Sequence, residues 1–190
     1  MKNLFTLSLF SLSAMLFVSC SSNDSIELAA DQSVQQFEAA GVQNTKNDAL
    51  FLAEAASAAM LQMRLSEAVT EKAVSPEVKE LAERMQEDHQ RILTDLQNMA
   101  SQSMFVLPQE LGNAHQKIYN EVNEHSGISF DLAYVKEVND LHDMLLDRYS
   151  DIADNGNDME VKVFSSKQLP LIRQHIEHTQ KISDQIDSAR

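Results

Sequence analysis

Apolar residues recur along this chain at intervals of three and four residues from about position 48 onwards, as at Phe51, Ala55, Ala58 and Leu65. Residues at these intervals share one face of a helix, so the pattern predicts amphipathic helices. We expect four long helices, over residues 48–74, 75–100, 129–155 and 157–188. No stretch alternates apolar and polar residues as a strand would. All four glycines, at positions 41, 112, 127 and 156, fall outside the four predicted long helices, as expected of residues that interrupt helices.

Two of these segments begin with residues that favour a helix N-terminus. Ser75 followed by Pro76 supplies an N-cap and a proline at the first helical position. Asn157 is followed three residues later by Glu160, an asparagine variant of the capping box. A longer connection after the second helix leads into a short amphipathic segment over about residues 111–124. The predicted fold class is all-α, a four-helix bundle whose long connection between the second and third helices contains a short extra helix.

The N-terminus resembles an export signal. Lys2 precedes an apolar run over residues 4–18, which has the length of a signal peptide and is short for a membrane span. The run ends in Phe17-Val18-Ser19-Cys20, which resembles the lipobox of bacterial lipoprotein precursors, and Cys20 is the only cysteine. We therefore expect residues 1–19 to be a lipoprotein signal peptide and Cys20 to carry the lipid. An ordinary secretory signal or an uncleaved anchor is the alternative.

Residues 20–47 are rich in Ser, Asn, Gln and Ala and contain few large apolar side chains. We interpret them as a flexible tether from the lipidated Cys20, about 30 Å end to end, to a folded domain over residues 48–188. A transient helix around residues 27–40 would not change that role. The expected location is the cell envelope, as an outer membrane lipoprotein that faces the periplasm or the cell surface. The membrane would be its partner through the lipid anchor.

The charge balance excludes one class of partner. With 15 basic and 29 acidic residues the chain has a net charge of -14, so we expect no binding to nucleic acid. No Gly-x-Ser-x-Gly elbow and no phosphate-cradling glycine loop occur. We therefore expect no enzymatic activity, and the sequence indicates neither a protein partner nor an oligomeric state.

Histidines on the apolar stripes are the best candidates for a site. His89, His142 and His175 each occupy the stripe of a different predicted helix. At about 1.5 Å per residue, all three and Gln62 lie near the middle third of the bundle, so their side chains could converge. His178, three residues after His175, lies on nearly the same face and could join them.

Two interpretations of these histidines remain open. In the first, they belong to a buried hydrogen-bonded network supported by Gln62, Asp88, Asp131 and Tyr134, in which Asp88 fixes the tautomer of an imidazole on an adjacent helix. In the second, they bind a transition metal, zinc or copper, with His178 or Gln62 beside them. Asp131 is too far from His142 along its helix, about 16 Å, to share an ion with it. It is better placed to interact with the helix dipole or a neighbouring helix.

A di-iron site is not expected. Such sites use Glu-x-x-His motifs, but Gln86 and Ile172 stand three residues before His89 and His175.

Five segments in order resemble a known family. They are FLAEAASAAMLQMRLSE, SPEVKELAERMQEDHQ, LPQEL, SGISFDLAYVKEVNDLH and KQLPLIRQHIEHTQ. Together they resemble the bacterial envelope family catalogued as domain of unknown function 4142, which is grouped with the ferritin-like four-helix domains. The resemblance covers about residues 47–181. Its most specific features are the Asp88-His89 pair, Phe130-Asp131 with Tyr134, His142, and Leu169-Pro170 with His175.

This resemblance implies an exported ferritin-like bundle of unsettled activity. In one departure, Gln62 stands where the family usually has Glu, which weakens a carboxylate-bridged metal site. Our leading hypothesis is a lipid-anchored, non-catalytic binding or stress-protective module of the cell envelope. The alternatives are a protein that binds or sequesters a transition metal at the histidine cluster and, third, a metal-dependent oxidoreductase.

Overall fold

A computed structural model describes residues 24–188 of the chain. These residues contain helices and no strand. The helices are α1 (Ser25–Ala39), α2 (Lys46–Lys72), α3 (Pro76–Ser101), α4 (Asn113–Asn123), α5 (Ile128–Asn155) and α6 (Met159–Ser188). The all-α prediction is confirmed, and the four predicted long helices correspond to α2, α3, α5 and α6. The short helix predicted in the long connection is α4.

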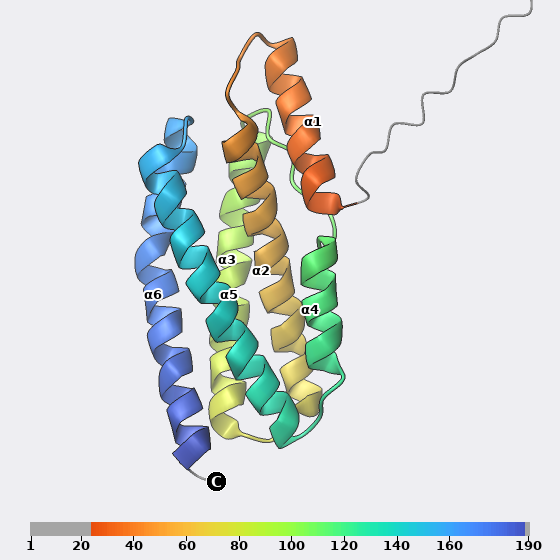
Figure 1. Cartoon of the computed structure of the whole chain (residues 1–190), viewed down its shortest axis with the longest axis vertical. Coiled ribbons are helices and arrows are strands. Elements are labelled where there is room, and N and C mark those ends of the chain that lie inside the picture. Colours follow the sequence, from red (N-terminus) through yellow and green to blue (C-terminus); the bar gives the residue numbers. More distant parts are fainter. Residues whose placement is uncertain (1–23, 189–190) are drawn as a thin grey trace, which may run out of the picture.

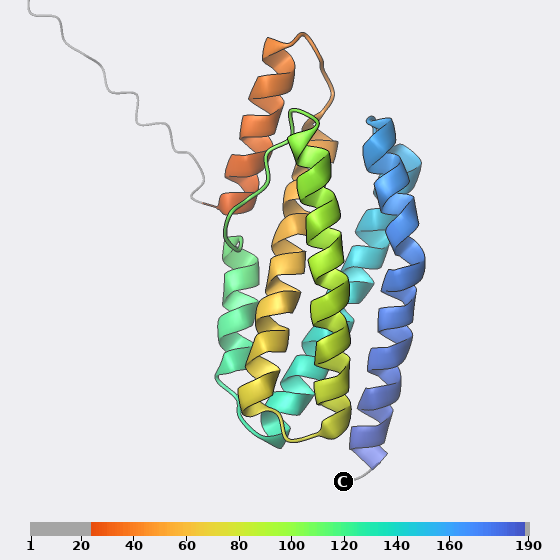
Figure 2. The same ribbon diagram turned by 180° about the vertical axis from the view of Figure 1, so that it is seen from behind.

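Four long helices stand side by side with alternating direction (Figures 1 and 2). Helices α2 and α3 form one antiparallel hairpin, and α5 and α6 form a second. The hairpins meet where α5 contacts α2 and α6 contacts α3, while α1 and α4 cover the outer side of α2. Each long helix therefore has one face in a shared interior, as a four-helix bundle requires.

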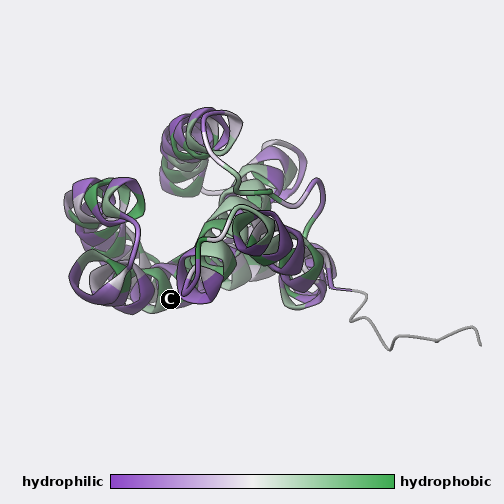
Figure 3. Cartoon of the chain, turned by 90° about the horizontal axis from the view of Figure 1, so that it is seen from above, coloured by the Kyte–Doolittle hydropathy of each residue, from purple (hydrophilic) through white to green (hydrophobic). Residues whose placement is uncertain are grey.

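The helices bury an apolar interior and leave hydrophilic residues outside, as the view from above shows (Figure 3). Phe51, Leu61, Met85, Phe130 and Tyr134 are among the largest side chains with less than 2% exposure. None of the helices in residues 24–188 is long and apolar enough to cross a membrane.

The structure corrects the predicted tether over residues 20–47. Most of that segment is helix α1, which packs on α2 and buries Ala29, Ala30, Ser33 and Phe37. The Phe37 ring lies 4.7 Å from the ring of Phe105. Small side chains on α1 let it approach the alanine-rich α2 closely, so few large apolar residues are needed to hold it. The predicted signal peptide and Cys20 lie outside the described residues.

Asp24 fixes the beginning of α1. Its Oδ1 accepts a hydrogen bond from the Ile26 amide at 2.9 Å, and its Oδ2 accepts one from the Asn113 amide at 2.8 Å. One carboxylate therefore caps the N-termini of both α1 and α4. Gly112 allows the approach, because a Cβ there would lie 2.5 Å from the Ile26 Cδ1. The folded part thus includes Asp24 and α1, which lie well before the predicted boundary at residue 48.

Two buried aspartates hold the helical hairpins to one another. Asp131, in the first turn of α5, accepts hydrogen bonds from the amides of Val74 and Ser75, which connect α2 to α3. Asp48, in the first turn of α2, accepts hydrogen bonds from the amides of Asn157 and Asp158, just before α6. Both aspartates are 0% exposed. Each carboxylate satisfies backbone donors at a chain reversal and links one hairpin to the other.

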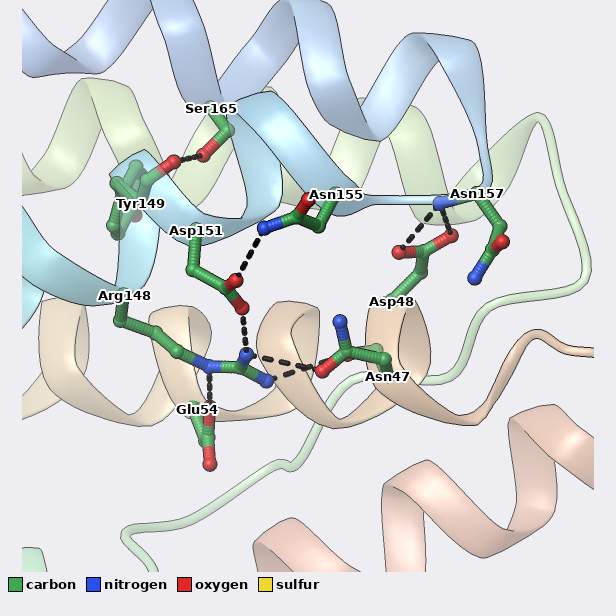
Figure 4. A network of polar contacts seen from close by, with 9 residues as sticks. All are labelled: Asn47, Asp48, Glu54, Arg148, Tyr149, Asp151, Asn155, Asn157 and Ser165. Atoms are coloured by element: carbon green, nitrogen blue, oxygen red, sulfur yellow. Dashed lines mark hydrogen bonds and ion pairs between the residues drawn. The ribbon is translucent and has the colours of Figure 1, made fainter.

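The cap of α6 differs from the predicted one. Asp158 Oδ1 accepts hydrogen bonds from the amides of Glu160 and Val161 at 2.8 and 3.1 Å, so Asp158 caps the helix. The backbone N–H of Asn157 instead donates a hydrogen bond to the Asp48 carboxylate (Figure 4). The predicted asparagine capping box is wrong because the chain reversal is one residue longer than the sequence pattern indicates.

Arg148 joins α5 to α2 near the same end of the bundle (Figure 4). Its Nε donates to Glu54 Oε2 at 2.8 Å, and its Nη1 donates to Asn47 Oδ1 at 3.0 Å. Its guanidinium also lies over the Phe51 ring, 5.7 Å from the centroid. This network and the Asp48 contacts fix the position of α5 along α2, and with it the level at which the α5 histidine enters the interior.

Candidate metal centre

Three imidazoles from three helices meet inside the bundle. They belong to His89 on α3, His142 on α5 and His175 on α6, which are 2%, 0% and 1% exposed. His89 Nε2 lies 3.1 Å from His142 Nε2, and His175 Nδ1 lies 2.9 Å from the same atom. One nitrogen from each ring lies within 4.8 Å of the others, close enough for all three to hold a single metal ion.

The sequence brings these rings together through helix periodicity. Each histidine occupies the buried stripe of its helix, and the two hairpins fix the three positions at one level along the bundle. The rings of His142 and His175 are nearly perpendicular, at 85°, with centroids 4.8 Å apart. Their nitrogens therefore point towards a common space, and the faces of the rings do not stack.

Hydrogen bonds on the outer side of the rings determine where two protons lie. His142 Nδ1 is 2.6 Å from the carbonyl oxygen of Val138, which can only accept, so this nitrogen carries a hydrogen. His175 Nε2 is 3.0 Å from Asp88 Oδ2, which also accepts. In neutral rings, His142 Nε2 and His175 Nδ1 therefore both carry lone pairs. These two lone pairs face each other at 2.9 Å.

The surroundings favour neutral rings. Burial, followed by the charges of His142 and His175, lowers the pKa of His89 well below its usual value. Burial and then the charge of His175 lower the pKa of His142 to about 3. Burial also lowers the pKa of His175, although Asp88 opposes this effect. At neutral pH a proton is thus unfavourable in the space between the rings, and the facing lone pairs repel one another.

The donor set fits a transition-metal ion. Neutral imidazole suits zinc and copper, and at a tetrahedral zinc ion adjacent nitrogens lie about 3.3 Å apart. Two of the three observed separations, 2.9 and 3.1 Å, are close to that value. The third pair of nitrogens lies within 4.8 Å, so rotations of the rings would bring all three to one ion. Ligating histidines usually donate their second ring nitrogen to a carboxylate or a carbonyl. Asp88 and Val138 provide these acceptors for His175 and His142.

Asp88 also connects the site to the surface. Its Oδ2 contacts the buried His175, and its Oδ1 accepts a hydrogen bond from Arg91 Nη1 at 3.0 Å. Asp88 lines a cleft between α3 and α6, together with Glu87, Arg91 and Gln174. The histidines are therefore separated from solvent on this side by one carboxylate and the arginine that contacts it.

The structure does not bring His178 to the three rings. Three residues rotate a helix by about 300°, so His178 points about 60° away from His175. It is partly exposed and lines a cleft between α3 and α6 with Glu77, Arg84 and Lys181. His178 is thus beside the cluster and outside the set of three ligand atoms that lie close together.

Of the predicted supporting residues, all of which lie in the described part of the chain, only Asp88 forms a hydrogen bond with a histidine of the cluster. Asp131 is at the α2–α3 connection, as described above. Tyr134 donates to or accepts from Ser66 Oγ at 3.2 Å, two turns before His142, and burial raises the pKa of its hydroxyl. Gln62 is 0% exposed, and both of its amide atoms are without a hydrogen-bond partner.

Sequence reasoning missed two groups at the site. The Val138 carbonyl belongs to the backbone, so its role cannot be inferred from the residue type, although it lies one turn before His142. Arg91 could have been inferred from its position three residues after Asp88, a spacing at which opposite charges interact on a helix.

A serine–histidine pair lies elsewhere, between α2 and α4. Ser57 Oγ is 2.7 Å from His115 Nδ1 and also accepts a hydrogen bond from the Gly112 amide at 2.9 Å. Ser57 is 0% exposed. The pair holds the N-terminus of α4 against α2 and offers no accessible nucleophile.

Comparison with known families gives one match. Residues 33–182 match the family described as Domain of unknown function (DUF4142). The chain belongs to this family. The match runs from within α1 to within α6 of this DUF4142 member and includes Asp88 and all three clustered histidines. No curated protein and no solved structure gives a significant match. The family description names no activity, and the histidine cluster is the feature of this chain that indicates a chemical role.

Proposed function

We propose that this DUF4142 protein is a cell-envelope domain that binds one transition-metal ion, zinc or copper, through His89, His142 and His175. The observation that carries the proposal is the approach of two neutral imidazole lone pairs, on His142 Nε2 and His175 Nδ1, to 2.9 Å. A metal ion between them converts this repulsion into two coordinate bonds. The third nitrogen, His89 Nε2, is close enough to complete a three-ligand set.

A purely hydrogen-bonded network explains the same atoms less well. It would need an extra proton between His142 and His175, and therefore a charged ring in a site where burial disfavours that charge. Asp88 compensates for part of this cost at His175 only. A metal ion also carries charge, but it gains up to three nitrogen ligands at once, and Asp88 partly balances it through His175.

The proposed role is binding or sequestration of the ion, with no catalytic step. The three rings are at most 2% exposed, so a substrate has no direct approach to an ion held between them. An oxidoreductase would need an open coordination position that a substrate can reach. The location in the envelope is supported by the resemblance of residues 1–20 to a lipoprotein signal, with Cys20 as the lipid attachment point.

Metal titration tests this proposal. The chain is produced without residues 1–19, with Cys20→Ser and without a histidine tag; all described contacts lie within residues 24–188 and are kept. Zinc and copper are titrated against competing chelators, and metal content is measured by elemental analysis. We expect one equivalent of metal per chain in the parent and none in His142→Ala. An ion at one hundred times its dissociation constant should stabilise the parent by about 2.7 kcal/mol.

The matched control is His125→Ala, because His125 is exposed on the α4–α5 connection. It should bind metal as the parent does. Circular dichroism establishes that both variants are folded. A parent that retains no more zinc or copper than His142→Ala, and whose melting temperature neither ion changes, would contradict the proposal.

A further inference from the structure

Unpaired buried polar atoms gather beside the histidine cluster. Within residues 24–188, buried side-chain atoms without a hydrogen-bond partner include both amide atoms of Gln62, Gln86 Oε1 and His89 Nδ1. Buried polar groups in folded proteins nearly always have a partner, often an ordered water. These atoms therefore indicate a polar group between α2 and α3 that protein atoms alone do not supply.

The antiparallel α2–α3 hairpin gives the level of Gln62. Gln62 lies ten residues before Lys72, the last residue of α2, and His89 lies thirteen residues after Pro76, the first residue of α3. At about 1.5 Å per residue, the two side chains differ by about 4.5 Å along the bundle, which is less than one helical turn. Gln86 is ten residues after Pro76, at the same level as Gln62.

Helix α5 gives the same level independently. The contact between Ser66 Oγ and Tyr134 Oη, at 3.2 Å, places these two residues opposite each other. Gln62 lies four residues from Ser66, and His142 lies eight residues from Tyr134 in the same direction along the bundle. Gln62 is therefore about 6 Å from the level of His142. The two estimates, about 4.5 and 6 Å, place its amide about one helical turn from the level of the histidine rings.

We infer that a buried water molecule bridges Gln62 Oε1 and His89 Nδ1, and that Gln62 is thereby a positioning residue for the site. Two hydrogen bonds of about 2.8 Å allow one water to span the distance that a direct bond cannot cover. The water accepts the hydrogen of His89 Nδ1 and donates to Gln62 Oε1.

This arrangement decides the tautomer of His89. With its hydrogen on Nδ1, His89 presents a lone pair on Nε2, the nitrogen that lies 3.1 Å from His142 Nε2. Without the water and Gln62, the hydrogen would move to Nε2, where His142 Nε2 can accept it. Gln62 therefore completes the pattern already given by Val138 and Asp88, in which each ring has a partner on its outer side and a lone pair on its inner side.

The test is nitrogen NMR of the histidine rings in metal-free protein at pH 7.5, which distinguishes the two tautomers directly. We expect His89 to carry its hydrogen on Nδ1 in the parent and in Gln62→Glu, which keeps an acceptor. We expect it on Nε2 in Gln62→Leu. The matched control is Gln168→Leu, because Gln168 is another buried glutamine, two turns before His175 on α6. It should leave the tautomer unchanged.

Metal affinity is the second measurement, and its expected result rests on the proposed metal-binding function. Gln62→Leu should weaken zinc or copper binding about tenfold to a hundredfold, while Gln168→Leu leaves it unchanged. A parent in which His89 carries its hydrogen on Nε2, or a Gln62→Leu variant with the parental tautomer, would overturn the inference. If the parent shows the expected tautomer and binds no metal, the inference stands and the proposed function fails. If metal binds and Gln62→Leu changes neither quantity, the proposed function stands and the inference fails.

Discussion

The metal-free protein should lose stability as the pH falls from 7.5 to 5, because His142 accepts a proton only when the chain unfolds. Burial lowers the pKa of His142 in the folded protein to about 3. In the unfolded chain a histidine has a pKa of about 6.5. Between these values the unfolded state binds more protons than the folded state, so acid favours unfolding. The stability is complete above the unfolded pKa and decreases below it.

The size of this effect follows from the two pKa values. Each pH unit below about 6.5 removes about 1.4 kcal/mol until the folded pKa is reached. At pH 5, His142 alone should therefore cost about 2 kcal/mol of the free energy of unfolding. His89 and His175 act in the same direction, since burial lowers the pKa of both. Asp88 opposes the effect at His175, which should contribute least.

Urea unfolding in the presence of a chelator, at pH 7.5, 6.5 and 5, measures the effect. The parent is compared with His142→Gln and with the exposed-site control His125→Gln. We expect the loss of stability between pH 7.5 and 5 to be smaller by about 2 kcal/mol in His142→Gln than in the parent. His125→Gln should follow the parent. The same loss in His142→Gln as in the parent would show that His142 is protonated in the folded protein, and it would remove the reason for facing lone pairs.

Three further substitutions test the fold that positions the site. Asp131→Ala leaves the amides of the α2–α3 connection without their buried acceptor. It should lower the free energy of unfolding, measured in urea, by about 3 kcal/mol. Asp48→Ala should have a similar cost of about 3 kcal/mol and should also speed hydrogen exchange at Asn157, whose amide loses its acceptor. Phe37→Ala should cost about 3 kcal/mol and expose α1 to proteases, because it removes the contact with Phe105. A cost below about 0.5 kcal/mol for Phe37→Ala would show that α1 behaves as the tether the sequence suggests.

The long helices could be predicted from the sequence because their buried faces carry large apolar residues at helical spacing. The packing of helix α1 on the bundle could not, since three of its four buried residues are Ala29, Ala30 and Ser33. Such small side chains do not form the stripe of large apolar residues by which a buried helix is found in a sequence. Their burial depends on the close approach of α2, which is a tertiary contact. The N-cap of α6 was missed for a related reason: Asn157 is drawn to Asp48, more than a hundred residues away in sequence.

The convergence of three histidines could be predicted because each residue adds a fixed rise along a straight helix, so a residue count gives the level of a side chain along the bundle. His89, His142 and His175 were placed near one level by counting residues. The angular position around the helix is less certain from sequence, and His178 illustrates this. It shares the apolar pattern of its neighbours, yet the side of α6 on which it lies faces the cleft lined by Arg84 and Lys181.

What decides between a hydrogen-bonded network and a metal site is the position of single hydrogen atoms, and sequence gives no access to it. The Val138 carbonyl and one carboxylate oxygen of Asp88 hold the ring hydrogens of His142 and His175 on the outer nitrogens. The inner nitrogens of these two rings therefore carry lone pairs. Both contacts exist only after α3, α5 and α6 have assembled. The two hairpins are joined by contacts of α5 with α2 and of α6 with α3, and the contacts between α3 and α6 are the sparser of the two. His175 and Asp88 bridge α6 and α3 at the level of the site. An ion bound by one ligand from each of these helices would join the two hairpins where they otherwise touch least, so metal binding and the stability of the bundle should be coupled.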